Sequence, residues 1–342
     1  MTKMNAIGFT QHLPITDPNS FQLFKIEKPI PTGRDLLVKI IATSVNPVDV
    51  KVRGNGHGEQ TTPKIIGWDA YGEVTAVGEA VTLFKPGEKV FYAGSFIRSG
   101  TDSQFQLVDE RLVGHAPKKL TASQIGGMPL TSLTAWEALF ERLQINPDQP
   151  KKNAGQTILI INGSGGVGSI ATQLAHMAGL TVIASASRTE TIAWVRKNGA
   201  DKVVNHHHNL VTEVRKLGFR YVDDILNLND LDGHWDEIAE LIKPAGKVGA
   251  ITENERGVNL QKLTKKCASF HWEWMYSKSY YHTADMITQH NILERVAQLL
   301  DQGVIHSTVT QTLKPINVKN LKQAHQAVET NHMIGKIAIS NQ

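Results

Sequence analysis

Short apolar runs separated by Gly and Pro dominate the first 130 residues of the chain. Residues 35–45 (DLLVKIIATSV) are rich in Val, Leu and Ile, residues 71–78 (YGEVTAVG) alternate and end at a Gly, and a Pro-Gly turn divides residues 84–94 (FKPGEKVFYAG). Runs of this length between frequent turn residues predict β-strands. We therefore expect a folded-over β barrel or sandwich in this part of the chain.

Near residue 130 the pattern changes to strands that alternate with helices. Residues 129–145 carry apolar side chains at helical spacing, and TILIIN (157–162) is a short run that is almost wholly apolar. Such a strand is typical of a parallel sheet buried on both faces. Further strands are predicted at 181–185, 201–205, 222–228 and 246–251. Helical patterns lie between the early strands, so we expect a doubly wound parallel sheet.

From about residue 272 this alternation stops. Residues 290–303 and 321–330 have the pattern of amphipathic helices, and IGKIAIS (334–340) closes the chain as an apolar strand. This tail has too few apolar residues for a core of its own. We expect it to pack back on the first half of the chain.

Composition and charge limit the classes of function. The chain has 342 residues, which suffices for two domains. Its net charge is +4, and its densest basic clusters are isolated pairs of Lys residues, so we expect no nucleic-acid partner. The one cysteine, Cys267, excludes a disulfide framework and fits a reducing compartment. No apolar run approaches the ~20 residues of a membrane span, and residues 1–10 lack the features of a secretion signal. We therefore expect a cytoplasmic protein with no membrane partner.

A glycine-rich turn follows TILIIN and opens the next helix; it consists of Gly163, Ser164, Gly165, Gly166, Val167 and Gly168. Its first glycine permits a tight turn, the middle ones let backbone N–H groups approach a pyrophosphate, and the last lets helix and strand pack closely. The helix N-terminus favours the phosphate charge. The motif predicts a dinucleotide site, with a plain turn that binds no ligand as the alternative.

The end of the second strand of this domain indicates which dinucleotide is bound. NAD sites usually carry an Asp or Glu there that holds the ribose 2′-hydroxyl. Here the strand ends in ASASR (184–188), and Glu190 comes later, in the expected helix. Ser187 and the cationic Arg188 suit a 2′-phosphate. We predict NADP(H); alternatively, Arg188 is a solvated residue at the helix start.

Taken together, these motifs resemble the medium-chain dehydrogenase/reductase superfamily over the whole chain. The residues that carry the resemblance are SVNPVDVKVRG (44–54), GWDAYGEVTAVGEAV (67–81), FKPGEKVF, PLTSLTAWEAL, INGSGGVGSIATQLAHMAG (161–179), NGADKVVNH (198–206) and IGKIAI. They are most similar to the zinc-independent quinone oxidoreductase (zeta-crystallin-like) branch, in the group often labelled "zinc-type alcohol dehydrogenase-like".

The resemblance implies an α/β protein with two domains. A GroES-like catalytic domain would be split between residues 1–130 and 272–342, and a Rossmann NADP-binding domain would occupy residues 131–271. The superfamily resemblance also implies a homodimer or homotetramer.

The same resemblance argues against a zinc site. Asn46 stands where the zinc enzymes carry their first Cys ligand, and Trp68 stands at the His of Gly-His-Glu. No Cys matches the third ligand or the structural zinc lobe. Catalytic zinc needs about three protein ligands, so we predict no bound metal. We expect the His206–His208 run in a solvated loop.

Without such a Lewis acid, reduction of an electron-poor acceptor is the easier chemistry. We predict NADPH-dependent hydride transfer to a small-molecule acceptor, a quinone or an α,β-unsaturated carbonyl. The protein would offer hydrogen-bond donors to the oxygen on which negative charge builds. Two alternatives stay open: a metal-free carbonyl or alcohol reductase, and an NADPH-binding redox sensor or structural protein with little turnover.

The resemblance places candidate catalytic residues in the first motif. Asn46 and Asp49 lie where the family faces nicotinamide and substrate, and Asn46 could donate from its amide. Lys51, where zeta-crystallin-like enzymes carry a Tyr, could stabilise a developing enolate. Alternatively, Asn46 begins only a turn, Asp49 anchors Arg53, and Lys51 is a surface charge.

Aromatic residues are further candidates. Trp68 and Tyr71 could shape a flat pocket for the acceptor, or could be core residues. Residues 270–281 (FHWEWMYSKSYY) are expected as the hinge between the domains, with Phe270 and His271 near the cofactor, or as a dimer contact. The remaining cofactor contacts that the resemblance implies are Asn46, Thr134, His206, Ile251, Thr252 and, at the phosphates, Lys336. For Thr134 a helix-start hydroxyl and for Lys336 a solvated charge are the alternatives.

Overall fold

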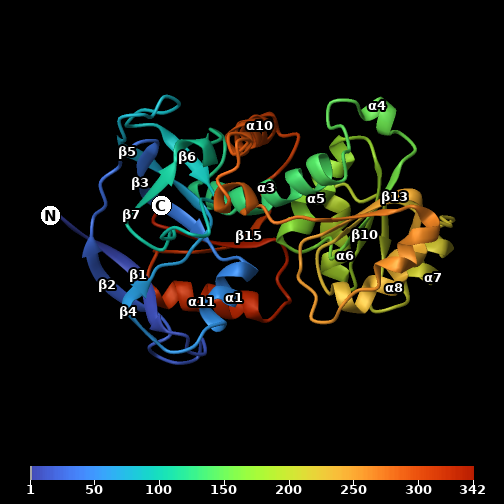
Figure 1. Ribbon diagram of the computed structural model, residues 1–342, viewed down its shortest axis with the longest axis horizontal. Helices are drawn as coiled ribbons and strands as arrows, with labels where there is room; N and C mark the ends of the chain where they lie inside the picture. The colour runs from blue at the N-terminus through green and yellow to red at the C-terminus, as the bar shows by residue number, and fades with distance from the viewer. Residues whose placement is uncertain (1) are drawn as a thin grey trace. The chain divides into compact units, whose positions relative to one another are not determined.

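The computed structural model describes residues 2–342, and the chain divides into two compact units (Figure 1). The β-rich unit runs through Leu133 and resumes with Tyr276–Gln342, whereas the parallel-sheet unit comprises Thr134–Met275. The domain boundaries expected from the sequence, after residues 130 and 271, lie a few residues before the ends of these segments at Leu133 and Met275.

The β-rich unit contains two sheets. The smaller sheet has the order β2-β1-β4, and the larger has the order β15-β16-β3-β5-β6-β8, with β7 also paired to β3. The strands are β1 (Lys3–Gln11), β2 (Gln22–Glu27), β3 (Asp35–Ser44), β4 (Glu59–Lys64), β5 (Ala70–Val77), β6 (Lys89–Tyr92), β7 (Phe105–Asp109), β8 (Val113–His115), β15 (Val309–Leu313) and β16 (Lys336–Ser340).

Strand β16 ties the end of the chain to its first half. It pairs antiparallel with β3, so that Ala338 faces Ser44 and Ser340 faces Ala42, and all five of its residues are buried. The tail thus completes the larger sheet, as its lack of an independent core predicts. The helices that begin in this unit are α1 (Pro47–Gly54), α2 (Ala122–Gly126), α3 (Pro129–Trp136), α9 (Ser277–Tyr280), α10 (Thr288–Gln302) and α11 (Val318–Glu329).

The parallel-sheet unit has six parallel strands in the order β11-β10-β9-β12-β13-β14. Numbered within the unit, this is the order 3-2-1-4-5-6 of the Rossmann fold. The strands are β9 (Thr157–Ile161), β10 (Thr181–Ser185), β11 (Lys202–Val204), β12 (Val222–Asn227), β13 (Ile242–Ala250) and β14 (Ser269–Trp272). The predicted α/β fold class is confirmed.

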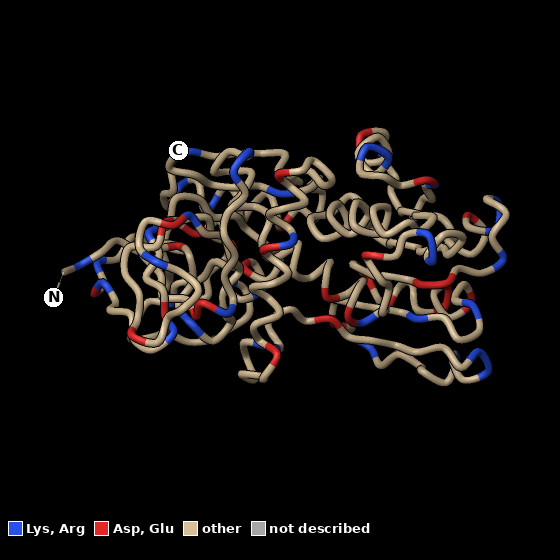
Figure 2. Tube along the Cα trace, turned by 90° about the horizontal axis from the view of Figure 1, so that it is seen from above, with Lys and Arg blue, Asp and Glu red and all other residues tan. Residues whose placement is uncertain are grey.

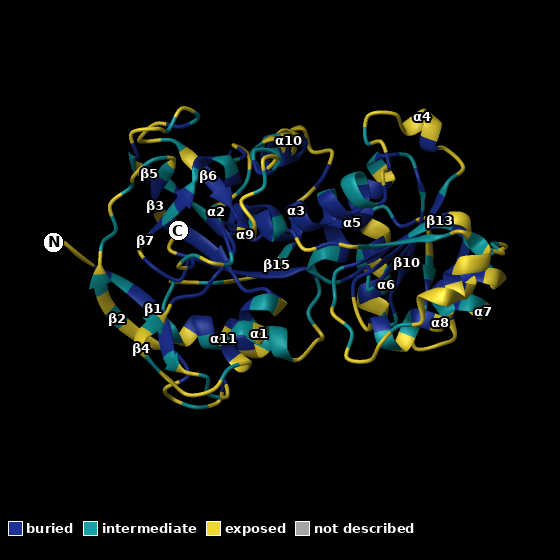
Figure 3. Ribbon diagram, in the orientation of Figure 1, coloured by how far each residue is buried: buried dark blue, intermediate teal, exposed yellow. Residues whose placement is uncertain are grey.

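Helices flank this sheet and leave their outer faces to solvent, as α7 and α8 show in Figure 3. Every residue of β9 is buried, which explains why TILII carries no charged side chain. The helices are α4 (Pro150–Asn153), α5 (Gly166–Met177), α6 (Thr189–Lys197), α7 (Leu210–Lys216) and α8 (Leu231–Leu241), with the π-helical segment η2 (Glu137–Arg142) and the 3-10 segment η3 (Leu260–Lys266).

Three elements differ from the sequence expectations. Helix α1 occupies residues that we treated in part as a turn, because Pro47 begins the helix and Asn46 and Asp49 cap it. The single helix expected over 129–145 changes to π-helical geometry at Glu137. Strand β14 lies in the segment that we treated as a hinge.

Charged residues of both signs are interspersed along the trace (Figure 2). Within residues 2–342, no helix combines the length and apolar character that crossing a bilayer requires.

Candidate functional site

The turn from β9 into α5 is the first part of the candidate site. Gly165 caps α5, and no side chain of the described residues makes a capping hydrogen bond there. A Cβ on Gly168 would lie 2.2 Å from the carbonyl oxygen of Asn162, and a Cβ on Gly163 would lie 2.8 Å from the Cβ of Ala184. Only glycine lets the helix approach the strands this closely. The start of α5 therefore offers backbone N–H groups to a phosphate.

Predicted cofactor residues follow three strands of the parallel sheet. Ser187 and Arg188 come after β10, His206 after β11, and Ile251 and Thr252 after β13. Because these strands are parallel, the residues lie at the same edge of the sheet as the glycine turn. The fold of one unit thus gathers them where Rossmann folds bind a dinucleotide.

Arg188 is placed where a phosphate could pair with it. Its backbone N–H donates to Thr191 Oγ1 at 3.0 Å, which fixes the start of α6. Its guanidinium lies 3.4 Å from the carboxylate of Glu190, and the two side chains are 39% and 56% exposed. An ion pair this exposed contributes little to stability. Loss of this ion pair would therefore cost the protein little.

Asn227 is a candidate cofactor residue that the sequence analysis missed. It ends β12 beside β9 and is fully buried. Neither its Oδ1 nor its Nδ2 has a hydrogen-bond partner among residues 2–342, and the same holds for Oγ1 of Thr252. Buried polar groups without partners are costly, so these atoms suit a ligand with hydrogen-bonding groups. The sequence signal was a polar residue at the end of a predicted strand.

Phe270 and His271 lie within strand β14 rather than in a hinge. The Phe270 ring packs 5.6 Å from that of Trp235, and His271 Nε2 shares a hydrogen bond of 2.9 Å with Ser269 Oγ. Phe270 is thus packed against the core of this unit and not at the carboxyl ends of the strands. Thr134 is the first residue of the same unit and is buried.

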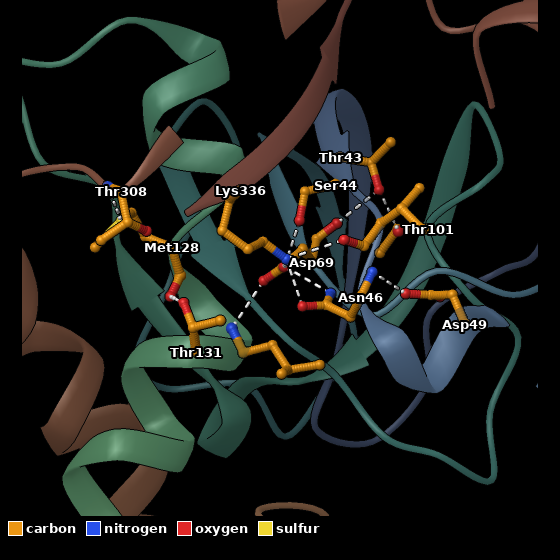
Figure 4. Close-up of polar contacts among 12 residues, drawn as sticks. Thr43, Ser44, Asn46, Asp49, Asp69, Thr101, Met128, Thr131, Thr308 and Lys336 are labelled. Atoms are coloured by element: carbon orange, nitrogen blue, oxygen red, sulfur yellow. Dashed lines mark hydrogen bonds and ion pairs between the residues drawn. The ribbon is translucent and has the colours of Figure 1, made fainter. Parts of the chain in front are cut away.

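In the β-rich unit, a buried polar cluster surrounds Asp69 (Figure 4). The Asp69 Oδ2 atom accepts hydrogen bonds from Ser44 Oγ at 2.5 Å, Asn46 Nδ2 at 2.8 Å and Lys336 Nζ at 3.1 Å. Its Oδ1 accepts the backbone N–H of Leu130 at 2.7 Å. The carboxylate is therefore fully paired, and the Lys336 ammonium balances its charge.

Lys336 is the first residue of β16, and it is only 3% exposed. Besides Asp69, its Nζ donates to Oδ1 of Asn46 and to the carbonyl oxygen of Val45, the latter at 3.3 Å. The three hydrogens of the ammonium thus have three protein acceptors. The expectation that Lys336 reaches the cofactor phosphates does not agree with this position.

Asn46 and Asp49 form the cap of α1. The backbone N–H of Asn46 donates to Asp49 Oδ2 at 2.7 Å, whereas Asp49 Oδ1 is buried and has no partner among the described residues. Burial raises the pKa of Asp49 to about 7. The expected alternative, an Asp49–Arg53 pair, is not present: Arg53 pairs with Glu329 and donates to the carbonyl oxygen of Leu13 at 2.5 Å.

The other predicted catalytic side chains differ in burial. Trp68 is 2% exposed, stacks on Phe96 with ring centroids 5.2 Å apart, and donates from Nε1 to the carbonyl oxygen of Ser95 at 3.3 Å. It is therefore a core side chain. Tyr71 is half-buried on β5, and Lys51 is exposed on α1, in keeping with a surface charge.

The histidine run after β11 lies at the surface of the parallel-sheet unit. His207 and His208 are exposed, and His206 is half-buried. Burial, followed by the charges of His207 and His234, lowers the pKa of His206. The ring is therefore neutral at pH 7 and can act as a hydrogen-bonding or stacking group.

Known proteins similar to this chain share its domain organisation. The sequence model of the alcohol dehydrogenase GroES-like domain matches residues 32–133, and that of the zinc-binding dehydrogenases matches residues 198–339. A zinc-type alcohol dehydrogenase-like protein of Staphylococcus aureus (strain MSSA476) is 41% identical over 338 residues, which cover 98% of this chain and 100% of that protein. The chain belongs to the medium-chain dehydrogenase/reductase superfamily, in the group of zinc-type alcohol dehydrogenase-like proteins.

Two solved structures illustrate the range of similarity. A Rhizobium etli CFN 42 protein assigned to the zinc-dependent alcohol dehydrogenases has a TM-score of 0.94 and 44% identity, with 100% of this chain and 99% of that one covered. The Escherichia coli quinone oxidoreductase in complex with NADPH has a TM-score of 0.80 and covers 98% of this chain and 99% of its own. At 22% identity it shares the fold alone.

An Arabidopsis thaliana superfamily member, the chloroplastic NADPH-dependent alkenal/one oxidoreductase, is 28% identical over 316 residues, covering 89% of this chain and 71% of that protein. The predicted superfamily and the predicted zinc-type alcohol dehydrogenase-like group are confirmed by these comparisons.

Zinc figures in the names of several relatives, but the residues of this chain do not fit a catalytic zinc ion. Both side-chain atoms of Asn46 are engaged, by Lys336 and by Asp69, and the indole of Trp68 offers a donor instead of a lone pair. Among residues 2–342, no group of three or more His, Cys, Asp or Glu could hold a metal ion.

Proposed function

We propose that this protein is an NADPH-dependent reductase of quinones or α,β-unsaturated carbonyls that works without zinc. One observation carries the proposal: the buried Asp69 already accepts four hydrogen bonds, one of them from the Lys336 ammonium. This part of the β-rich unit therefore supplies hydrogen bonds instead of ligands for a Lewis acid. Such a unit suits an acceptor that is electrophilic without metal assistance.

The NADPH preference rests on the strand end at Ser187 and Arg188. No carboxylate follows β10 directly, and the ion pair of the Arg188 guanidinium with Glu190 is exposed. Guanidinium groups pair well with phosphate oxygens. The alkenal/one oxidoreductase of A. thaliana, a relative of the same superfamily, supports both the cofactor and the acceptor class.

Each group of residues has one task in the proposed reaction. When bound, the nicotinamide cofactor supplies the hydride. The glycine turn holds the pyrophosphate and Arg188 the 2′-phosphate. Asn46 donates a hydrogen bond to the acceptor oxygen on which negative charge builds, and water delivers the proton to the product.

An acceptor screen tests this proposal. NADPH and NADH oxidation would be followed in parallel with 9,10-phenanthrenequinone, simple enones and aldehydes. We expect the quinone or the enones to oxidise NADPH faster than NADH. Turnover confined to aldehydes or alcohols would instead support a metal-free carbonyl or alcohol reductase. Tight NADPH binding without turnover would contradict both and favour a redox sensor or structural protein.

A further inference from the structure

The Lys336 ammonium lies in a buried site that provides an acceptor for each of its hydrogens. Its three acceptors, Asp69 Oδ2, Asn46 Oδ1 and the carbonyl oxygen of Val45, come from segments far from β16 in the sequence. Both charged side chains are buried, Lys336 to 3% and Asp69 to 0% exposure. A buried ammonium is tolerated when each of its hydrogens has an acceptor and a counter-ion lies beside it, and both conditions hold here.

The two charges fix the orientation of the Asn46 carboxamide. Its Oδ1 accepts from the Lys336 ammonium, and its Nδ2 donates to the Asp69 carboxylate at 2.8 Å (Figure 4). Turning the amide over would place NH₂ against the ammonium and oxygen against the carboxylate. Both contacts would then be repulsive, so the charges assign the amide atoms unambiguously.

One N–H of this amide remains for a ligand. The Asn46 Oδ1 already has a cation as its partner, and one of the two Nδ2 hydrogens is used by Asp69. The second Nδ2 hydrogen has no acceptor among the described residues. Asn46 can therefore act on a ligand as a donor, and its donor hydrogen is made more acidic by the neighbouring ammonium at the other end of the amide.

We propose that Lys336, together with Asp69, is a positioning residue for Asn46. The Lys336 ammonium and the Asp69 carboxylate hold the Asn46 amide so that its Nδ2 donates a hydrogen bond to the oxygen of the substrate that accepts the hydride. The inference deepens the proposed reductase function and rests on it for the identity of the acceptor. Lys336 touches neither acceptor nor cofactor in this role and works through Asn46 alone.

A double-mutant cycle tests whether Lys336 acts through Asn46. We expect Lys336→Met to lower kcat with NADPH and the responsive acceptor by on the order of 10-fold to 100-fold, because a misplaced donor loses transition-state stabilisation. The KM for NADPH should change little. In an Asn46→Ala background, the same Lys336→Met change should lower kcat no further. Independent, multiplicative losses would overturn the positioning role.

Two further variants keep this test informative if Lys336→Met folds poorly. Asp69→Asn combined with Lys336→Met removes both charges and leaves none unpaired. If that variant folds and keeps the wild-type kcat, the proposal is wrong. Lys278→Met is the matched control, since Lys278 is also a buried lysine of the β-rich unit and its Nζ donates to Thr288 Oγ1 at 2.8 Å. We expect it to lower stability without the coupling to Asn46.

A binding measurement separates this inference from the proposed function. Lys336→Ala removes the ammonium and three carbons of its stem, which n-propylammonium ions can replace. We expect n-propylammonium to raise the thermal unfolding midpoint of Lys336→Ala saturably, with no such effect on the wild type or on an isosteric propanol control. If n-propylammonium does not raise the midpoint of Lys336→Ala, the cation site is wrong. If it does, but the wild-type protein reduces no acceptor, the cation site stands and the reductase function is refuted.

Discussion

Arg188 is the residue on which cofactor choice depends in the proposed reductase. We expect Arg188→Ala to weaken NADPH binding by about 10-fold to 100-fold, because a charge-assisted hydrogen bond to phosphate contributes about 1.5–3 kcal/mol. NADH binding should stay unchanged. Fluorescence titration of both nucleotides measures the ratio. Arg196→Ala, at an exposed position of the same helix, is the matched control. An unchanged NADPH-to-NADH ratio would refute the phosphate assignment.

For other residues, the residue type and the surrounding motif predicted the position in the fold with unequal success. Ser187 and Arg188 follow β10 as the strand pattern indicated. Trp68 and Lys336 were less predictable, because burial depends on which distant segments cover them. A lysine in a terminal IGKIAI strand suggested a solvated or phosphate-binding charge, yet its partner Asp69 lies 267 residues away in the sequence.

The junction of β9 and α5 is the element that carries nucleotide binding. We expect Gly168→Ala to lower NADPH affinity by about 10-fold or more and to destabilise the protein by about 1–3 kcal/mol, because the new Cβ would collide with the backbone at Asn162 and Gly163. Nucleotide titration and urea unfolding measure the two effects. Gly257→Ala, where a Cβ meets nothing within 4 Å, should change neither. Full NADPH affinity in Gly168→Ala would contradict this role of the turn.

The π-helical segment η2 meets the end of β14 at a buried pair of carboxyl groups. Glu137 and Glu273 are both buried, and the Arg142 guanidinium lies 2.9 Å from Glu273. Burial, and next the Glu137 carboxyl, raise the pKa of Glu273 from 4.5 to about 9. The folded protein therefore holds a proton at Glu273 that the unfolded chain releases above pH 4.5. This contribution to stability is complete below pH 4.5 and is lost as the pH rises towards 9.

Glu273→Gln tests this pH dependence, since glutamine mimics the protonated acid. Between pH 6 and 8.5 the wild-type free energy of unfolding should fall more steeply than that of the variant, by up to about 1.4 kcal/mol per pH unit. Urea unfolding at several pH values measures both slopes. The control Glu255→Gln removes an exposed carboxylate from the same unit and should keep the wild-type slope. Equal slopes in Glu273→Gln and the wild type would show that Glu273 is ionised in the folded protein.

Metal independence is a prediction about the whole molecule. We expect prolonged treatment with EDTA or 1,10-phenanthroline to leave NADPH oxidation unchanged, because Asn46 and Trp68 stand at the ligand positions and neither provides a free metal-binding atom. A zinc alcohol dehydrogenase treated in parallel shows that the chelator works. Activity that is lost on chelation and restored by added zinc would disprove metal independence.

At this scale, the sequence by itself determined the fold class, the glycine turn and the residues at the end of β10. These features depend on short-range patterns: the period of apolar positions, the spacing of glycines, and the residue type next to a strand end. The tertiary structure alone decided that Lys336 pairs with Asp69 and Asn46, that Trp68 is a core residue, and that the buried side chain of Asn227 has no hydrogen-bond partner within residues 2–342. Those contacts follow from how β16 aligns with β3 and β12 with β9. Strand register joins segments that are far apart in the chain, and no local pattern encodes it.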